Sequence, residues 1–133
     1  MKLFLFLLNA FVLSASHKSF ADDVAMDTFY EIAKENCHSI ASIRVEMDRI
    51  NNEILNLLAE RTAYVQRAGD LKSQTTKIAD DRQRVAAQEK KIIEKSLELG
   101  VPIEISIPAF RAIVENSIQF QQKYIDQLNS NQS

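Results

Sequence analysis

One long amphipathic stretch constrains the fold of this chain more than any other feature. After Ser39, which can cap a helix N-terminus, apolar side chains recur every three or four residues. They are Ile40, Ile43, Met47, Ile50, Ile54, Leu57, Leu58, Val65, Ala68 and Leu71. This spacing predicts one helix of about 35 residues, roughly 50 Å long. Such a helix outruns the core of a small domain, so we expect it to pair with another chain in an isologous dimer.

The rest of the chain also favours helices. The sequence has only two glycines and two prolines, and no alternation of polar and β-branched residues typical of a strand. A polar loop at 73–79 precedes a second helix, which begins at Asp80 or Asp81 and ends at Gly100. Before the long helix, residues 22–35 are weakly amphipathic and suggest a short helical segment. The predicted fold is all-α, with three main helices in one domain.

The third main helix is predicted at residues 110–128, with its start left open. Pro108 suits the first turn of a helix, because its missing N–H needs no partner there. On that pattern the helix begins near Ser106, and residues 103–105 are a lead-in.

The first 21 residues are predicted to be a signal peptide. Lys2 gives a basic start, residues 3–13 form an apolar run too short to span a bilayer, and Ser-Phe-Ala at 19–21 fits a cleavage site. An N-terminal anchor or a buried helix is the alternative, and the polar residues after the apolar run disfavour it. We expect export to the periplasm or the medium, cleavage near Ala21 and a mature domain of residues 22–133.

Composition excludes several classes of function. Removal of Lys2 and Lys18 with the signal peptide leaves 14 of the 16 basic side chains against 18 acidic ones, a net charge of 14 − 18 = −4. A nucleic-acid-binding protein normally has the opposite balance. Cys37, the only cysteine, is expected to be a half-buried packing residue; the alternatives are an interchain disulfide or a reactive thiol. His38 is the only remaining histidine, so the residues needed for nucleophile–histidine catalysis or for a histidine-rich metal site are not all present in the mature chain.

Three cations on the long helix suggest an anion site. Arg61 and Lys72 lie eleven residues apart, about 20° in azimuth and about 16 Å in rise, so both can reach one small ligand. Arg44 lies about 42 Å from Lys72 along the axis and is turned about 80° away. It cannot share their pocket within one chain, but an antiparallel dimer brings it near Arg61 and Lys72 of its partner. Chance spacing on a highly charged helix is the alternative.

The other predicted helices add polar residues at helical spacing. The second presents Asp81, Arg84 and Gln88 on one face, and the third presents Ser117 and Gln121. A set of these residues resembles the site of the all-helical chorismate mutases: Arg44, Arg61, Lys72, Asp81, Arg84, Ser117 and Gln121. The resemblance covers roughly residues 40–122. It implies an intertwined homodimer with two equivalent sites, and an isomerase of aromatic amino-acid biosynthesis that converts chorismate to prephenate.

That chemistry needs no cofactor, metal or nucleophile. Chorismate is a dianion that rearranges in one pericyclic step, so the enzyme holds the diaxial conformer and stabilises charge on the ether oxygen. By resemblance, Arg61, Arg84 and Arg44 of the partner subunit would bind the carboxylates. Lys72 and Gln121 would donate to the ether oxygen, and an amide can do so across neutral pH. The residues left to orient the ring hydroxyl and a carboxylate are Asp81 and Ser117.

Val85 departs from the family pattern. Many members have a glutamate here that contacts the ring hydroxyl, and Ile78 also stands where a proline is frequent. Isochorismate-pyruvate lyases, which share the fold, resemble this chain at Arg84-Val85-Ala86 and are the alternative. Export favours the mutase, because the lyase serves cytoplasmic salicylate synthesis.

A non-catalytic exported helical interaction module is a further alternative. It would have kept the scaffold without the reaction. Four buried cations without a ligand would be costly, which argues against it. We expect no nucleic-acid partner and, after signal removal, no membrane partner.

Overall fold

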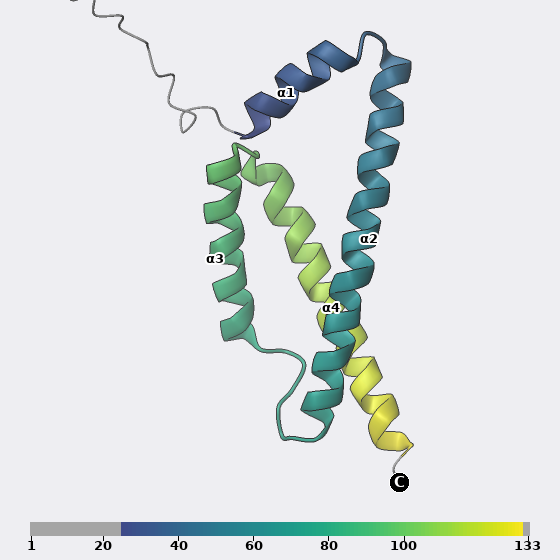
Figure 1. Ribbon diagram of the computed structural model, residues 1–133. Coiled ribbons are helices and arrows are strands. Elements are labelled where there is room, and N and C mark those ends of the chain that lie inside the picture. Colours follow the sequence, from purple (N-terminus) through teal and green to yellow (C-terminus); the bar gives the residue numbers. More distant parts are fainter. Residues whose placement is uncertain (1–24, 132–133) are drawn as a thin grey trace, which may run out of the picture.

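The computed structural model describes residues 25–131, which form four α-helices and no strand. In chain order they are α1 (Ala25–Asn36), α2 (Ile40–Ser73), α3 (Arg82–Leu99) and α4 (Ile103–Ser130). The all-α prediction is confirmed, with α1 as the short helical segment before the three main helices (Figure 1). The predicted signal peptide lies outside the described residues. None of the helices within residues 25–131 combines the length and the hydropathy of a membrane span.

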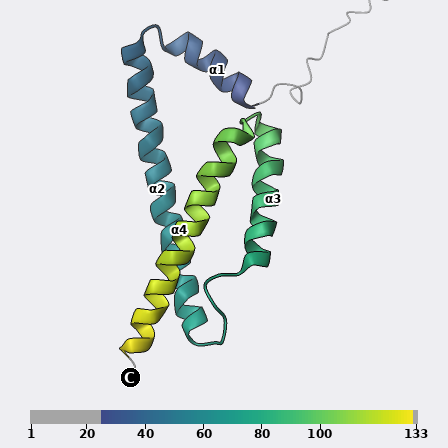
Figure 2. The ribbon, with the colours of Figure 1, turned by 180° about the vertical axis from the view of Figure 1, so that it is seen from behind.

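α2 is the long helix that the apolar stripe predicted. It has 34 residues and is about 51 Å long. Ser39 and Ser42 form a capping box at its start: each side-chain oxygen accepts a hydrogen bond from the other residue's backbone N–H, both over 3.1 Å. The C-terminal half of α2 lies against α4, whereas its N-terminal half stands away from α3 and α4 (Figures 1 and 2).

α3 lies antiparallel beside α4, and both ends of α3 are set by local chemistry (Figure 2). At its start, the Asp81 carboxylate accepts a hydrogen bond from the Arg84 N–H over 2.9 Å. At its end, Gly100 has a φ of 72°, a left-handed conformation that glycine adopts without strain. The chain therefore reverses within three residues and enters α4.

α4 begins earlier than Pro108 suggested. Ile103 is its first residue, so the expected lead-in at 103–105 is wrong and Pro108 lies inside the helix. The Pro102 carbonyl accepts hydrogen bonds from the N–H groups of Ile105 and Ser106, over 2.9 and 3.2 Å. The buried Ser106 hydroxyl also lies 2.7 Å from the Ser96 hydroxyl of α3. These bonds set the helical path before Pro108, whose missing N–H removes one later bond.

The contact between α2 and α4 centres on Gly69. Gly69 is buried, and a Cβ added there would lie 2.9 Å from Cδ1 of the Tyr124 ring. Beside this contact, the Tyr124 hydroxyl donates to the Asp70 carboxylate over 2.6 Å. Because Gly69 has no side chain, α4 can approach α2 closely at the level of Gln121, whose Cγ would lie 3.5 Å from that Cβ.

The chain has little apolar core of its own. Among the described residues, Ala79 and Ile125 are the only apolar side chains that are buried. On the N-terminal half of α2 the stripe is exposed, with Ile43 at 38% and Met47 at 52% of full exposure. The side of α2 that was predicted to pack is therefore open in a single chain.

Candidate active site

A pocket of about 480 Å³ lies where α2, α3 and α4 meet. Four cations line it: Arg61 and Lys72 from α2, Lys77 from the loop before α3, and Arg84 from α3. Asp81 is the only carboxylate among the lining residues. The pocket is therefore a local concentration of positive charge in an acidic chain, and it suits a small ligand with more than one negative group.

Lys72 and Gln121 meet at the deep side of this pocket. Nζ of Lys72 donates to Oε1 of Gln121 over 2.9 Å and to the Ala79 carbonyl over 3.3 Å. Nε2 of the buried Gln121 donates to the Val65 carbonyl over 2.6 Å. An ammonium only donates and a carbonyl only accepts, so the two bonds fix which way the amide faces. Each nitrogen keeps one further hydrogen for a ligand.

Arg61 is held by Ser117 of α4. Nη1 of Arg61 donates to the Ser117 hydroxyl over 2.6 Å, and that hydroxyl donates to the Ile113 carbonyl over 2.6 Å. Since a guanidinium has five N–H groups in a planar fork, most of them stay available for a carboxylate. Ser117 thus orients a cation in the empty pocket, in addition to the substrate contact that the resemblance implies for it.

Asp81 and Arg84 sit at the α3 end of the pocket. The Asp81 carboxylate already caps α3 through Oδ1, which leaves its second oxygen for a ligand hydroxyl. The Arg84 guanidinium has no hydrogen-bond or ion-pair partner within the part of the chain that the structure describes. A cation that lines a pocket without a partner is suited to bind an anion.

Arg44 does not reach this pocket. It is exposed on the N-terminal half of α2, and among residues 25–131 its side chain has no ion-pair or hydrogen-bond partner. Of the four cations expected to be buried, Arg44 and Arg84 are exposed and Arg61 and Lys72 are half-buried. The expectation that these cations are buried is wrong for a single chain, because one side of α2 is exposed to solvent. The cost of burying charge therefore does not distinguish an enzyme from a non-catalytic module.

Three polar pocket residues were not assigned a role from the sequence. Lys77 lies in the loop between α2 and α3, where no helical spacing can place a side chain. Tyr64 lines the pocket from α2, but an exposed tyrosine near the apolar stripe carries no site signal by itself. Gln88, which shares a face with Asp81 and Arg84, also lines the pocket.

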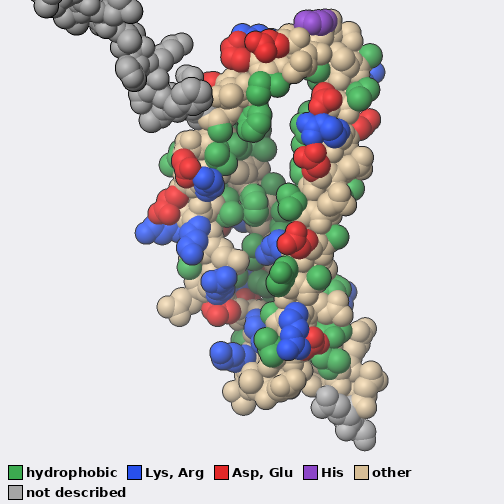
Figure 3. Space-filling view, in the orientation of Figure 1, with side chains coloured by type: hydrophobic (Ala, Val, Ile, Leu, Met, Phe, Trp, Pro, Cys, Tyr) green, Lys and Arg blue, Asp and Glu red, His purple; other side chains and the backbone are tan. Residues whose placement is uncertain are grey.

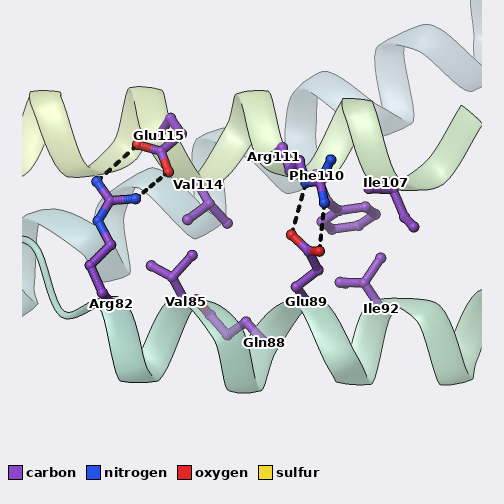
Figure 4. Close-up of a pocket in the computed structure, with 10 residues that line it drawn as sticks. All are labelled: Arg82, Val85, Gln88, Glu89, Ile92, Ile107, Phe110, Arg111, Val114 and Glu115. Atoms are coloured by element: carbon purple, nitrogen blue, oxygen red, sulfur yellow. Dashed lines mark hydrogen bonds and ion pairs between the residues drawn. The ribbon is translucent and has the colours of Figure 1, made fainter.

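Val85 lies between this pocket and a second cavity of about 250 Å³ on the α3–α4 contact. In Figure 4, Val85 points towards Val114 of α4, and two ion pairs bridge the helices on either side. The ion pairs are Arg82–Glu115, at 2.6 Å, and Glu89–Arg111, at 2.7 Å. The hydrogen bond from Arg111 lowers the pKa of Glu89 below its ordinary value. All four charges are paired, so we assign them to holding α3 against α4.

The fold and the pocket define a small all-α protein whose cation-lined pocket suits a multiply charged anion. Its described residues contain no group of three or more His, Cys, Asp or Glu side chains that could hold a metal ion. Residues 43–122 match the family Chorismate mutase type II, and the chain belongs to that family. A chorismate mutase from Methanocaldococcus jannaschii is 28% identical over 88 residues, which cover 66% of this chain and 89% of the relative. No solved structure gives a significant match.

Proposed function

We propose that this protein is a chorismate mutase that rearranges chorismate to prephenate. The observation that carries the proposal is the Lys72–Gln121 hydrogen bond, which sets two donors at one point of a cation-lined pocket. Membership of the family and the M. jannaschii relative support it.

In a pericyclic isomerase, some pocket residues bind the substrate and others stabilise the transition state. Arg61 and Arg84 bind the substrate carboxylates and select the diaxial conformer, in which the reacting carbons approach. As the ether C–O bond breaks and the new C–C bond forms, negative charge grows on the ether oxygen. Lys72 and Gln121 donate to that oxygen, and one such donor is worth about 10²–10³ in rate. No proton moves and no group is transferred, so no nucleophile is required.

A second copy of the chain completes the proposed site. Among residues 25–131 Arg44 is a cation without a partner, on a helix whose apolar stripe is exposed, and both features call for another chain. In an antiparallel pair of α2 helices, Arg44 of the partner subunit approaches Arg61 and supplies a third guanidinium to the carboxylates. Two equivalent pockets follow from the two-fold symmetry.

Isochorismate-pyruvate lyase is the second candidate, and Val85 is the observation that favours it. Val85 lines the pocket where a glutamate would contact the ring hydroxyl of chorismate. Isochorismate carries its hydroxyl elsewhere on the ring, so an apolar residue here would not reduce its binding. The same cations would hold the carboxylates while pyruvate is eliminated.

One experiment separates the candidates. The protein is incubated with chorismate and, separately, with isochorismate, and prephenate, pyruvate and salicylate are followed. The blank is the Arg61→Ala/Lys72→Ala variant, which removes both cations of α2 from the pocket. Prephenate from chorismate above that blank supports the mutase, and pyruvate with salicylate from isochorismate supports the lyase. If the protein turns over neither substrate, the non-catalytic interaction module is the interpretation that remains.

We also propose that the protein is exported after cleavage near Ala21. The support is the basic start, the short apolar run and the small-x-small pattern at 19–21. N-terminal sequencing of the chain from a fractionated cell should find Asp22 as the first residue, outside the cytoplasm. A cytoplasmic chain that keeps its first residues would contradict the proposal.

A further inference from the structure

α1 lies outside the part of the chain that matches the family and has an apolar face with little to pack on. The family match begins at residue 43, after α1 has ended. Met26, Phe29, Tyr30, Ala33 and Cys37 follow helical spacing, and Phe29 and Tyr30 are 69% and 63% exposed. A 12-residue helix is marginal in water by itself, so its formation calls for a packing partner.

α1 spans an opening in the molecule. Figure 1 shows it crossing from the start of α2 to the turn that joins α3 and α4, and it contacts α3. Figure 3 shows the opening below it, between α2 and the α3–α4 pair, with hydrophobic side chains mainly on the α3–α4 side and acidic and basic side chains on the α2 side. The exposed α2 residues Ile43, Met47 and Ile50 lie on the same stretch of helix. α1 and this stretch of α2, both with exposed apolar side chains, thus lie on two sides of the same opening.

A second copy of this chain is the occupant that this surface fits. The pocket needs Arg44 of the partner subunit, so an α2 helix of the partner must run along the exposed stripe that adjoins α1. Lys34, the only cation of α1, is paired with Glu31 at 2.6 Å, so α1 offers no free cation to a nucleic acid or an anionic surface. Lys34 also lies 5.1 Å from the centre of the Tyr30 ring. An apolar helix therefore suits this face better than a nucleic acid or an anionic surface.

We infer that α1 is a clasp that closes over the long helix of the partner and slows dissociation of the dimer. The inference rests on the dimer of the proposed function and extends it to a segment that the family match does not include. With α1 in place, the partner helix is enclosed by α1, α2 and the α3–α4 pair. Separation of the subunits then requires α1 to lift away first.

The test compares two double variants of α1. Phe29→Gln/Tyr30→Gln removes the apolar face, and Thr28→Gln/Glu35→Gln places the same side chains on the opposite face as a control. Subunit exchange is followed by energy transfer between chains that carry different dyes, and circular dichroism checks the helix content. We expect exchange at least about ten-fold faster in the first variant, because buried aromatic residues dominate interface energies. Exchange rates equal to the control, or a wild-type chain that stays monomeric, would overturn the inference.

A cross-linking experiment keeps the test independent of the stability of these variants. A photoreactive benzoylphenylalanine replaces Phe29 in an affinity-tagged chain, which is mixed with an untagged wild-type chain and illuminated. We expect cross-links that join the tagged chain to the untagged one; cross-links within one chain alone would overturn the inference. Neither measurement depends on turnover, so a failure of the mutase proposal is recognised separately, by the absence of prephenate from the concentrated wild-type protein.

Discussion

Nζ of Lys72 donates to Oε1 of Gln121 over 2.9 Å, although the two residues lie 49 positions apart in the chain. The bond joins α2 to α4 at the level where Gly69 lets the helices approach. It aligns an ammonium and an amide on one point of the pocket before any ligand binds. The catalytic strength of the proposed site therefore depends on the packing of two helices as well as on the cations themselves.

Lys72→Ala should lower kcat by about 10²–10³, because the lost interaction strengthens as charge grows on the ether oxygen. KM should change much less, since the carboxylate contacts proposed for Arg61 and Arg84 remain. Steady-state kinetics of prephenate formation measures both constants. Lys123→Ala, which removes an exposed lysine of α4 that does not line the pocket, is the control. An unchanged kcat would rule out the role assigned to Lys72.

The two glycines should respond differently to alanine. Gly69→Ala places a Cβ 2.9 Å from the Tyr124 ring, so α4 must shift and the unfolding free energy should fall by about 1–3 kcal/mol. Since Gln121 moves with α4, kcat should fall as well. Gly100→Ala strains a φ of 72° and should cost about 1 kcal/mol without an effect on kcat. Urea titration and kinetics of both variants check this. A normal kcat in Gly69→Ala would show that catalysis does not depend on the close contact between α2 and α4.

Val85→Glu should raise kcat/KM for chorismate, because a carboxylate at this position can accept a hydrogen bond from the ring hydroxyl. Stability should fall at the same time, since Val85 also faces Val114 across the α3–α4 cavity (Figure 4). Ala86→Glu, on an exposed neighbouring position of α3, is the matched control. A fall in kcat/KM, or no change, in a folded Val85→Glu variant would count against this explanation of the departure.

Mixing two inactive variants should restore activity. In the proposed homodimer, Arg44→Ala and Lys72→Ala each damage both sites, but the mixed dimer has one intact site, with Lys72 from one chain and Arg44 from the other. After random exchange, about a quarter of the wild-type activity should return, by the symmetry of an isologous dimer. A mixture of Arg61→Ala with Lys72→Ala is the control, since both changes fall within one chain's contribution to a pocket. If the first mixture stays as inactive as the control, Arg44 is not shared between subunits.

Acid should weaken the contact between α2 and α4 through Asp70. The hydrogen bond from the Tyr124 hydroxyl, helped by Arg67, lowers the pKa of Asp70 below its ordinary value of 3.8. A carboxyl whose pKa is lower in the folded state stabilises the fold above its unfolded pKa and loses that effect as pH falls through the folded pKa. Asp70→Asn should therefore show a smaller loss of stability than wild type between about pH 5 and pH 2.

The measurement for Asp70 is the urea midpoint at several pH values. Glu35→Gln is the control, because the Glu35 carboxylate has no hydrogen-bond or ion-pair partner among residues 25–131. An Asp70→Asn curve parallel to that of wild type would show that the Tyr124 bond does not contribute to acid stability.

The fold was predictable where local chemistry alone decides it. Ser39, Asp81 and Gly100 mark helix ends through caps and a left-handed φ, and the structure places the ends there. The start of α4 was not predictable from Pro108, because hydrogen bonds to the Pro102 carbonyl already commit the chain to a helix.

The candidate site was predictable only as far as helical spacing reaches. That spacing puts Arg61 and Lys72 on one side of α2, and both line the pocket. It cannot show that Ser117 holds Arg61, because this bond depends on how α4 crosses α2. Nor can it place Lys77, which lies in a loop, or the burial of the cations, which depends on what lies beside α2.

The exposed stripe of α2 and the two buried apolar side chains, Ala79 and Ile125, have a consequence for how the protein folds. In the proposed dimer, a chain with so small an interior gains most of its apolar burial by meeting another chain, so folding becomes a second-order reaction. Dilution alone should then unfold this protein, as urea unfolds a monomer. Its melting temperature should rise with the logarithm of its concentration.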